Sequence, residues 1–480
     1  MRRVTKQWFN RAEVWATRNP ALATLGAWVV LVLARLPYWW WLFPSPITSD
    51  NYYQISQVIG RIPWWDHHPV GSTLAMGATI APLYPLIGLA GAIAITSLLQ
   101  VAVTSAIVAY ALRRMFTWGL RLPVLLSVLG LYALFPPFSE AVVTVYKDTQ
   151  FGFAFLLWIV LLIDLTRAPA ACLGNWRWVA AFMLTMAAVA LFRHNGSYVT
   201  FATAIVLLIV YRAHWRRVLV AVLVPLLVAT VGMRIVNNVL GTAPGSVVEA
   251  LSVPLQQIGR TARDHPTSFT GPQLGFIAEL FDGRTPAEVG QVYYPNSSDP
   301  LKGFPGNPGI ITPGVVDGNL LWFARGWLDL GLSHPGTYLA AFAENYYRYF
   351  IPHRQQAFLP MVLRTFDDAT MLPFLGDRTF TPTPLGTLLT PMVRLYRVPV
   401  LGLPWAAAVW TWLCIVAFIA LIRARRHRLA LVVGVPILVL FLTILAGPLN
   451  GSFRYLLPII LTTPILYPLA TFNPRPTRTS

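Results

Sequence analysis

The chain has 480 residues, of which 56% are hydrophobic and only 11% charged, and its formal net charge is +18. Soluble domains contain about 25% charged residues, so the composition excludes an ordinary water-soluble protein and indicates a chain embedded in lipid. Strong positive charge in a soluble protein would suggest nucleic-acid binding, but here it must first be assigned to the loops between membrane spans. Cys172 and Cys414 lie in or beside apolar segments and offer neither a disulfide framework nor metal-ligand spacing.

Ten segments are candidates for membrane spans, because a spanning helix needs about 20 largely apolar residues. They are 21–43, 91–112, 122–138, 149–166, 177–192, 196–211, 218–237, 403–422, 429–446 and 455–471. The first is too long for a signal peptide and lacks a small-residue cleavage site, so we expect it to remain as an uncleaved span.

The apolar segment 71–88 decides the topology. It is short, and Pro82 and Pro85 are expected to interrupt a helix there. If it lies at the interface or re-enters, the inner segments hold 19 of the 36 lysines and arginines but only one of the 18 acids. If it spans, the arginines of 113–121 move to the outside. The positive-inside rule therefore favours ten spans with both termini in the cytoplasm, although the sequence does not decide between an interfacial and a spanning 71–88.

This topology leaves one large aqueous region, 238–402, which is rich in Pro, Gly, Asn and Asp. Helical patterns at 246–263 and 333–350 alternate there with turn signals at 295–300 and 303–309. We therefore predict an all-α integral membrane protein with one mainly helical extracytoplasmic domain. Its predicted parts are an N-terminal transmembrane module 1–237 with catalytic outer loops, the first of them 44–90; the extracytoplasmic domain 238–402; C-terminal transmembrane helices 403–471; and a cytoplasmic tail 472–480.

Polar residues gather in the first outer loop, close to the end of the first span. Asp50 follows an aromatic belt at 38–41, and apolar side chains between 53 and 62 form a strip typical of a helix lying on the membrane surface. His67 and His68 close this loop. Asp50 could instead cap the helix that follows it. The two histidines could be interfacial polar residues, since as a metal pair they lack i, i+4 spacing.

The other short outer loops carry charges at the same face of the membrane. The second holds Lys147 and Asp148, the third Arg193 and Asn195, and the last Arg454. A carboxylate can act as a general base towards a hydroxyl, and Arg or Lys can bind a phosphate and stabilise the charge that develops on it as it leaves. The set therefore indicates a reaction on an anionic, lipid-linked substrate, although each cation could simply extend from a span end into the headgroup region.

This arrangement resembles the GT-C glycosyltransferases, polytopic enzymes that use polyprenyl-phosphate-linked sugars at the outer face of the membrane. Asp50 in S-D-N-Y-Y matches the acidic residue that follows their first span, and Asp148 in Y-K-D-T-Q-F resembles their second outer-loop acid. D-H-H-P-V-G-S-T-L at 66–74 is similar to the entry of their second interfacial helix. Asp50 is followed by Asn51 and not by a second acid, so the resemblance does not carry over a metal-binding acidic pair.

More of the chain, from about residue 20 to residue 470, resembles a family of bacterial membrane proteins known only by a domain-of-unknown-function label. The resembling strings are Y-K-D, F-R-H-N-G-S-Y at 192–198, L-S-V-P-L-Q-Q-I-G-R at 251–260, Y-Y-P-N-S-S-D-P-L-K at 293–302 and G-S-F-R-Y-L-L-P at 451–458. Gln256, Gln257 and Arg260 become candidates for a helix that returns from the outer domain to cover the site. An ordinary amphipathic helix with a solvated polar face explains them equally well.

Together these observations predict inverting transfer of a sugar from a polyprenyl-phosphate donor to a glycan or lipid acceptor of the bacterial cell envelope. Asp50 would be the general base, and Asp148 would orient the acceptor or assist. Lys147, Arg193 and Arg454 would neutralise the lipid phosphate. The remaining substrate-binding candidates are His67, His68, Asn195, Gln256, Gln257 and Arg260.

A transporter or flippase of lipid-linked envelope intermediates is the main alternative, with the same charges along a transport route. Transporters tend to contain internal repeats and mid-membrane polar groups on broken helices, and the sequence shows neither. A non-catalytic scaffold of the same ancestry is a third interpretation. The expected partners are these substrates and membrane lipids. Nucleic acid is not expected as a partner, because no basic patch falls in the aqueous domain. A divalent cation is the one cofactor that the sequence leaves open.

Overall fold

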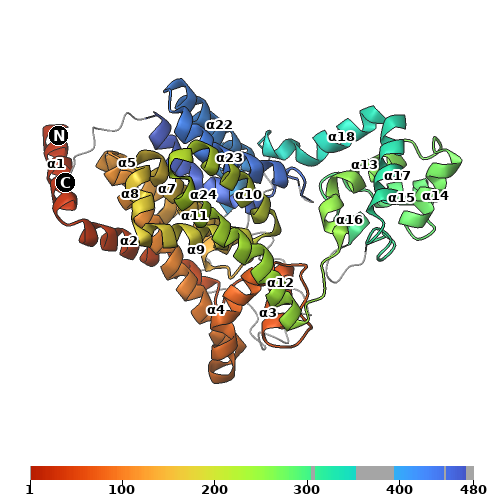
Figure 1. Ribbon diagram of the computed structural model, residues 1–480, viewed down its shortest axis with the longest axis horizontal. Coiled ribbons are helices and arrows are strands. Elements are labelled where there is room, and N and C mark those ends of the chain that lie inside the picture. The colour runs from red at the N-terminus through yellow and green to blue at the C-terminus, as the bar shows by residue number, and fades with distance from the viewer. Residues whose placement is uncertain (1, 304–308, 353–393, 448–449, 472–480) are drawn as a thin grey trace.

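The computed structural model describes residues 2–303, 309–352, 394–447 and 450–471. Within these ranges the chain is helical, and its strand-like pairing is limited to two isolated bridges, Trp65 with Ala243 and Tyr294 with Ser297. Figure 1 shows a bundle of apolar helices with a smaller helical domain beside it. The all-α prediction is therefore confirmed for the described residues, whereas the tail 472–480 lies outside them, as does the part 353–393 of the predicted outer domain.

Each segment that the sequence predicts as apolar forms a helix of the bundle. The helices are α2 (Pro20–Trp41), α4 (Val70–Thr117), α5 (Leu122–Leu134), α6 (Pro136–Val143), α7 (Lys147–Arg167), α9 (Trp176–Phe192), α10 (His194–Val210), α11 (Trp215–Leu227), α12 (Met233–Leu240), α22 (Ala407–Arg423), α23 (His427–Ile444) and α24 (Phe453–Thr471), with α1 (Arg2–Arg18) and α8 (Pro169–Gly174) at the periphery.

The lengths of these helices identify a multi-pass membrane protein. Six helical segments of the described chain are long and apolar enough to cross a membrane, or seven if α5 and α6, which are bent by 58° relative to each other, form one span. The helices α9, α10 and α22 are apolar but shorter than 18 residues. In an apolar 18-residue stretch of α7 and of α24, 83% and 89% of the residues are buried within the protein, so these two helices form the centre of the bundle.

The helix α4 consists of two helices that meet at Gly88, whose φ of 71° lies in the left-handed region that favours glycine. Figure 1 shows the two halves as an orange V at the lower edge of the bundle. The helix continues through Pro82 and Pro85, so the expectation that these prolines interrupt it is wrong. Prolines are tolerated inside membrane helices because neighbouring groups satisfy the freed backbone positions, and the break falls at the glycine instead.

The smaller domain begins after α12 and has a hydrophobic core of its own, in which Leu255, Ile277, Leu301 and Leu330 are fully buried. Its elements are η3 (Val247–Leu251), α13 (Ser252–Asp264), α14 (Gly271–Leu280), α15 (Pro286–Val292), α16 (Asp299–Lys302), α17 (Leu320–Ser333), α18 (Pro335–Tyr346) and η4 (Tyr347–Tyr349). The two helical patterns predicted for this region are therefore confirmed. The turn signal at 303–309 falls mostly on residues outside the described ranges.

A third, small core holds the segment between α2 and α4 against the bundle. The helix α3 (Ser49–Val58) packs on both halves of α4 through side chains that include Ile55, Met76 and Ile93. Val145, which precedes α7, belongs to the same core. This packing fixes the start of α3 next to the start of α7.

Candidate functional site

The charged and titratable residues of the short loops lie where helices begin. They are Asp50 (second residue of α3), His68 (two residues before α4), Lys147 and Asp148 (first two residues of α7), Arg193 (the residue before α10) and Arg454 (second residue of α24). The first turn of a helix leaves backbone N–H groups without intrahelical partners and carries a partial positive charge. Contacts between these side chains show that the five helix starts surround one place.

The carboxylate of Asp50 is the centre of this cluster. Its Oδ2 accepts a hydrogen bond of 2.7 Å from the Tyr146 hydroxyl and another from the Lys147 ammonium, and Arg454 Nη1 lies 3.5 Å from it. Burial alone would raise the pKa of the Asp50 carboxyl, but the positive charges of Lys147 and Arg454 outweigh burial and hold the pKa well below its usual value. Asp50 is therefore an ionised carboxylate held by two cations.

The neighbours of Asp50 explain why its carboxylate is not needed as a helix cap and can contact Lys147 and Arg454. Thr48 is the N-cap of α3, and Asn51 completes a capping box with it, so the alternative interpretation of Asp50 as the cap is wrong. Asn51 also donates to the carbonyl oxygens of Pro46 and Val145, at 3.1 Å and 2.9 Å. Asn51 thereby ties α3 to the segment that carries Tyr146 and Lys147.

A second carboxylate, Asp148, completes the cluster. Arg193 Nη1 lies 2.6 Å from its Oδ1 and Arg454 Nε lies 3.9 Å from its Oδ2, while the carboxylate is fully buried. Both guanidinium groups lie 4.9 Å from the centre of the Tyr455 ring, a cation–π arrangement that holds two like charges close together. Arg454 thus bridges the two carboxylates.

The cluster therefore contains more positive than negative charge. It holds two carboxylates and three cations, and all five side chains are at most 16% exposed. Since the adjacent helix starts add partial positive charge, the site has an electrostatic preference for an anion. Chemically, it combines an ionised carboxylate with an anion-binding set at the end of membrane helices.

Glycine and close packing position Arg193. A Cβ at Gly196 would lie 1.9 Å from the carbonyl oxygen of Val189, so only glycine permits the tight reversal between α9 and α10. The glycine of the F-R-H-N-G-S-Y string thereby places the residue before α10 at the cluster. Asn195, in the same turn, donates to Thr443 Oγ1 at 2.9 Å and ties α10 to α23.

The two histidines connect the cluster to the smaller domain. His68 Nδ1 lies 3.1 Å from Lys147 Nζ, and the His67 ring stacks on Trp65 with its Nδ1 3.8 Å from Glu249 Oε1. Glu249 also pairs with Lys302, whose side chain is 3% exposed. Burial lowers the pKa of both imidazoles, so both are neutral at pH 7.

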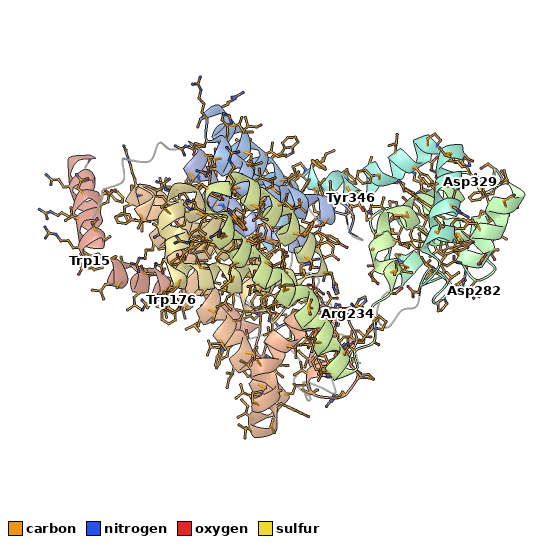
Figure 2. The ribbon with its side chains drawn as sticks, in the orientation of Figure 1. Trp15, Trp176, Arg234, Asp282, Asp329 and Tyr346 are labelled. Carbon is orange, nitrogen blue, oxygen red and sulfur yellow. The ribbon has the colours of Figure 1, made fainter. Side chains whose placement is uncertain are left out.

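Asn450 fixes the loop before Arg454 to the outer domain. Its side-chain amide donates to Asn296 Oδ1 at 3.0 Å and to the Glu344 carbonyl oxygen at 2.8 Å, and its Oδ1 accepts from the Arg348 backbone N–H at 3.1 Å. The Tyr346 hydroxyl, labelled in Figure 2 between the two parts of the molecule, donates to the Gly447 carbonyl oxygen at 2.9 Å. The position of Arg454 therefore depends on the outer domain.

Comparison with known proteins identifies a family. Residues 64–477 match a family of unknown function, DUF6020. The chain belongs to this family. No curated protein and no solved structure gave a match. The matched range includes the cluster from His67 to Arg454 but begins after Asp50, so the central carboxylate lies outside it.

Three of the predicted site residues lie elsewhere, in α13 of the outer domain. Gln256 donates to the Tyr294 carbonyl oxygen, and Gln257 both donates to the Tyr338 carbonyl oxygen and accepts from Trp327. Arg260 pairs with Glu344 and Asp264. In the described chain these side chains hold α13 to α17, α18 and the loop before α16. The structure does not bring them into the Asp50 cluster.

Sequence reasoning did not assign a site role to four residues that the structure places at the cluster or next to it. Tyr146 bonds Asp50, Tyr455 lies under the two arginines, and Glu249 with Lys302 reaches His67. The tyrosines directly adjoin predicted site residues in the sequence. Lys302 is the last residue of Y-Y-P-N-S-S-D-P-L-K at 293–302, one of the strings that carry the family resemblance. Nothing in the sequence indicates that Glu249 pairs with it.

The donor set does not fit a divalent cation. Within the described residues no group of three or more His, Cys, Asp and Glu side chains could hold a metal ion. Asp50 and Asp148 face Lys147, Arg193 and Arg454 instead. These three cations would repel a divalent metal ion placed beside the two carboxylates.

Proposed function

We propose that this protein is a membrane glycosyltransferase of the GT-C kind that transfers a sugar from a polyprenyl-phosphate donor to a cell-envelope acceptor. The observation that supports the proposal is the buried cluster in which the ionised Asp50 meets Lys147 and Arg454 at the starts of helices. A lipid-linked phosphate needs a cationic site next to the bilayer, and a hydroxyl acceptor needs a carboxylate. The cluster supplies both.

In the proposed reaction the acceptor oxygen attacks the anomeric carbon, a glycosidic bond forms, and the bond from that carbon to the phosphate oxygen breaks with inversion. Asp50 accepts the proton of the attacking hydroxyl. The lipid phosphate leaves with the electron pair of the broken bond, and Lys147, Arg193 and Arg454 stabilise its charge. Asp148 orients Arg193 and Arg454 and assists in holding the acceptor.

The strong pairing of Asp50 has a role in this proposal. A carboxylate that is paired with two cations is a weak base. When the donor phosphate enters, Lys147 and Arg454 acquire a second anionic partner, which weakens their hold on Asp50 and raises its basicity. Donor binding would thus prepare the base for the acceptor.

The proposed topology follows the positive-inside distribution of charge. Counting the bent α5–α6 pair and the shorter α9, α10 and α22 together with the six long helices would give ten spans. Both termini would then lie in the cytoplasm and the cluster would face the outside of the bacterial cytoplasmic membrane.

The test is sugar transfer by purified protein with a labelled polyprenyl-phosphate sugar and membrane extract as acceptor. We expect release of polyprenyl phosphate and labelled product, and we expect Asp50→Asn to lower turnover by about 10²–10⁴-fold, the range of general-base catalysis. Asp282, which lies at the far side of the outer domain (Figure 2), provides a matched control, and Asp282→Asn should leave turnover unchanged. Movement of the intact donor across vesicles without cleavage would favour the transporter, and undiminished turnover of Asp50→Asn would remove Asp50 from the mechanism.

A further inference from the structure

The imidazole of His68 uses only one of its two nitrogens. His68 is 4% exposed, and its Nδ1 lies 3.1 Å from the Lys147 ammonium. Its Nε2 is buried and has no hydrogen-bond partner among the described residues. A buried polar atom without a partner costs free energy, so this nitrogen requires an explanation.

The contact with Lys147 determines which nitrogen carries the proton. An ammonium group that is paired with a carboxylate has three N–H donors and no acceptor. His68 Nδ1 must therefore accept from Lys147, and in a neutral ring the proton then resides on Nε2. The unpartnered atom is thus an N–H donor.

The surroundings of His68 keep the ring neutral. The charged or titratable groups that act on it are Lys147, Arg454, His67 and Asp50, and burial together with the cations lowers the pKa of His68 well below its usual value. Three of these neighbours belong to elements other than its own, namely α3, α7 and α24. A protonated ring would add a fourth cation to three that are already in the cluster.

We propose that the Nε2–H of His68 donates a hydrogen bond to a phosphate oxygen of the lipid-linked ligand. The inference rests on the proposed function and adds to it a specific donor that is fixed by Lys147. The cluster prefers an anion, its cations are shared with Asp50 and Asp148, and His68 is a donor that no protein acceptor in the described chain uses. A phosphate oxygen on the side of the ring that faces away from Lys147 would satisfy it without a further charge.

Two substitutions separate the donor from the contact with Lys147. His68→Gln has a side chain long enough to place an amide N–H near the position of Nε2. His68→Asn is shorter and can offer Lys147 an acceptor at the position of Nδ1, but it leaves no donor at Nε2. The purified variants are titrated with farnesyl phosphate in detergent, and inorganic phosphate is titrated in parallel.

We expect His68→Asn to weaken farnesyl phosphate binding by roughly 10-fold or more, as for the loss of a hydrogen bond to a charged group. His68→Gln should stay within about threefold of the wild type. If inorganic phosphate binds weakly or not at all while farnesyl phosphate ranks the variants as expected, the ligand is the lipid phosphate. Equal binding of inorganic phosphate would assign the site to free phosphate. Equal affinities of the Asn and Gln variants for farnesyl phosphate would overturn the inference.

The tautomer is measured independently of any ligand. The ¹⁵N shifts of the His68 ring in the wild-type protein should show a neutral ring with its proton on Nε2. A cationic ring or a proton on Nδ1 would overturn the inference even if both variants failed to fold. If farnesyl phosphate binds as expected while no sugar is transferred, the proposed glycosyltransferase activity fails and the phosphate contact of His68 stands.

Discussion

The two ends of α7 carry carboxylates in opposite situations. Near its C-terminal end, Asp164 is 2% exposed, and its Oδ1 accepts from Arg114 at 2.8 Å and 3.0 Å and from Trp118 at 2.8 Å. At its N-terminal end, Asp148 lies in a cluster of two carboxylates and three cations. At one end a single carboxylate accepts three hydrogen bonds, and at the other two carboxylates share three cations.

The hydrogen bonds show the same difference. Asp164 Oδ1 accepts three hydrogen bonds, whereas His68 Nε2 and Arg454 Nε in the other cluster are buried without hydrogen-bond partners among the described residues. Buried polar groups are normally satisfied in a finished structural network. A carboxylate satisfied by direct hydrogen bonds therefore indicates a structural role, and buried donors without partners beside three cations indicate a place prepared for an anion.

Neutralising the shared cation Arg454 should have the largest effect. Arg454→Gln removes the group that bridges Asp50 and Asp148, and a hydrogen-bonded charge is worth about 1.5–3 kcal/mol. We expect farnesyl phosphate affinity to fall about 10–100-fold and sugar transfer to fall at least as much. Isothermal titration and the transfer assay measure the two effects.

Arg114→Gln at the opposite end of α7 is the matched control and should leave farnesyl phosphate affinity unchanged. If both substitutions weakened binding to the same extent, the distinction between the two ends of the helix would be lost.

Asp164→Asn should have a smaller effect, and on stability alone. It removes the charge that Arg114 and Trp118 share, and we expect the free energy of unfolding to fall by about 1–3 kcal/mol, with turnover per folded molecule within about twofold. Thermal unfolding in detergent, together with the transfer assay on the folded fraction, measures both. A large loss of turnover in the folded fraction would show that the inner pair takes part in function.

The smallest effect is expected for Arg260→Gln in the outer domain. Arg260 is paired with Asp264 and Glu344 near the surface, where such pairs contribute about 0–1 kcal/mol. We expect a change in melting temperature of a few degrees at most and no change in farnesyl phosphate affinity. Reduced affinity would instead support the hypothesis that α13 covers the site.

The amino-acid sequence was sufficient to predict the helices but not every contact of the site. Apolar length and the distribution of arginine identify the helices and suggest which loops share a face. Asp50, Lys147, Arg193 and Arg454 could therefore be grouped from the sequence alone. The sequence could not decide whether Gln256, Gln257 and Arg260 join this group, because their local pattern had two interpretations. In V-P-L-Q-Q-x-x-R the amphipathic spacing was visible, but whether its polar face meets the cluster or α18 depends on tertiary packing.

The other wrong or missing predictions have equally physical reasons. Proline was expected to break α4, but the reversal requires a positive φ, which Gly88 adopts at no steric cost. Glu249 and Lys302 are 53 residues apart, and a lone carboxylate in an aqueous loop gives no local signal that it will pair with a distant lysine.

The contacts of Asn450 have a practical consequence for chimeric proteins. Asn450 bonds Asn296 across 154 residues of sequence, and Arg454 follows four residues later as the second residue of α24. An exchange of outer domains between members of the family would need to move 450–452 together with the domain, although these residues belong by sequence to the transmembrane half. In a chimera joined only at α12 and α22, Asn450 would meet the side chains of a different domain. Arg454 would then be misplaced although no residue of the bundle had been substituted.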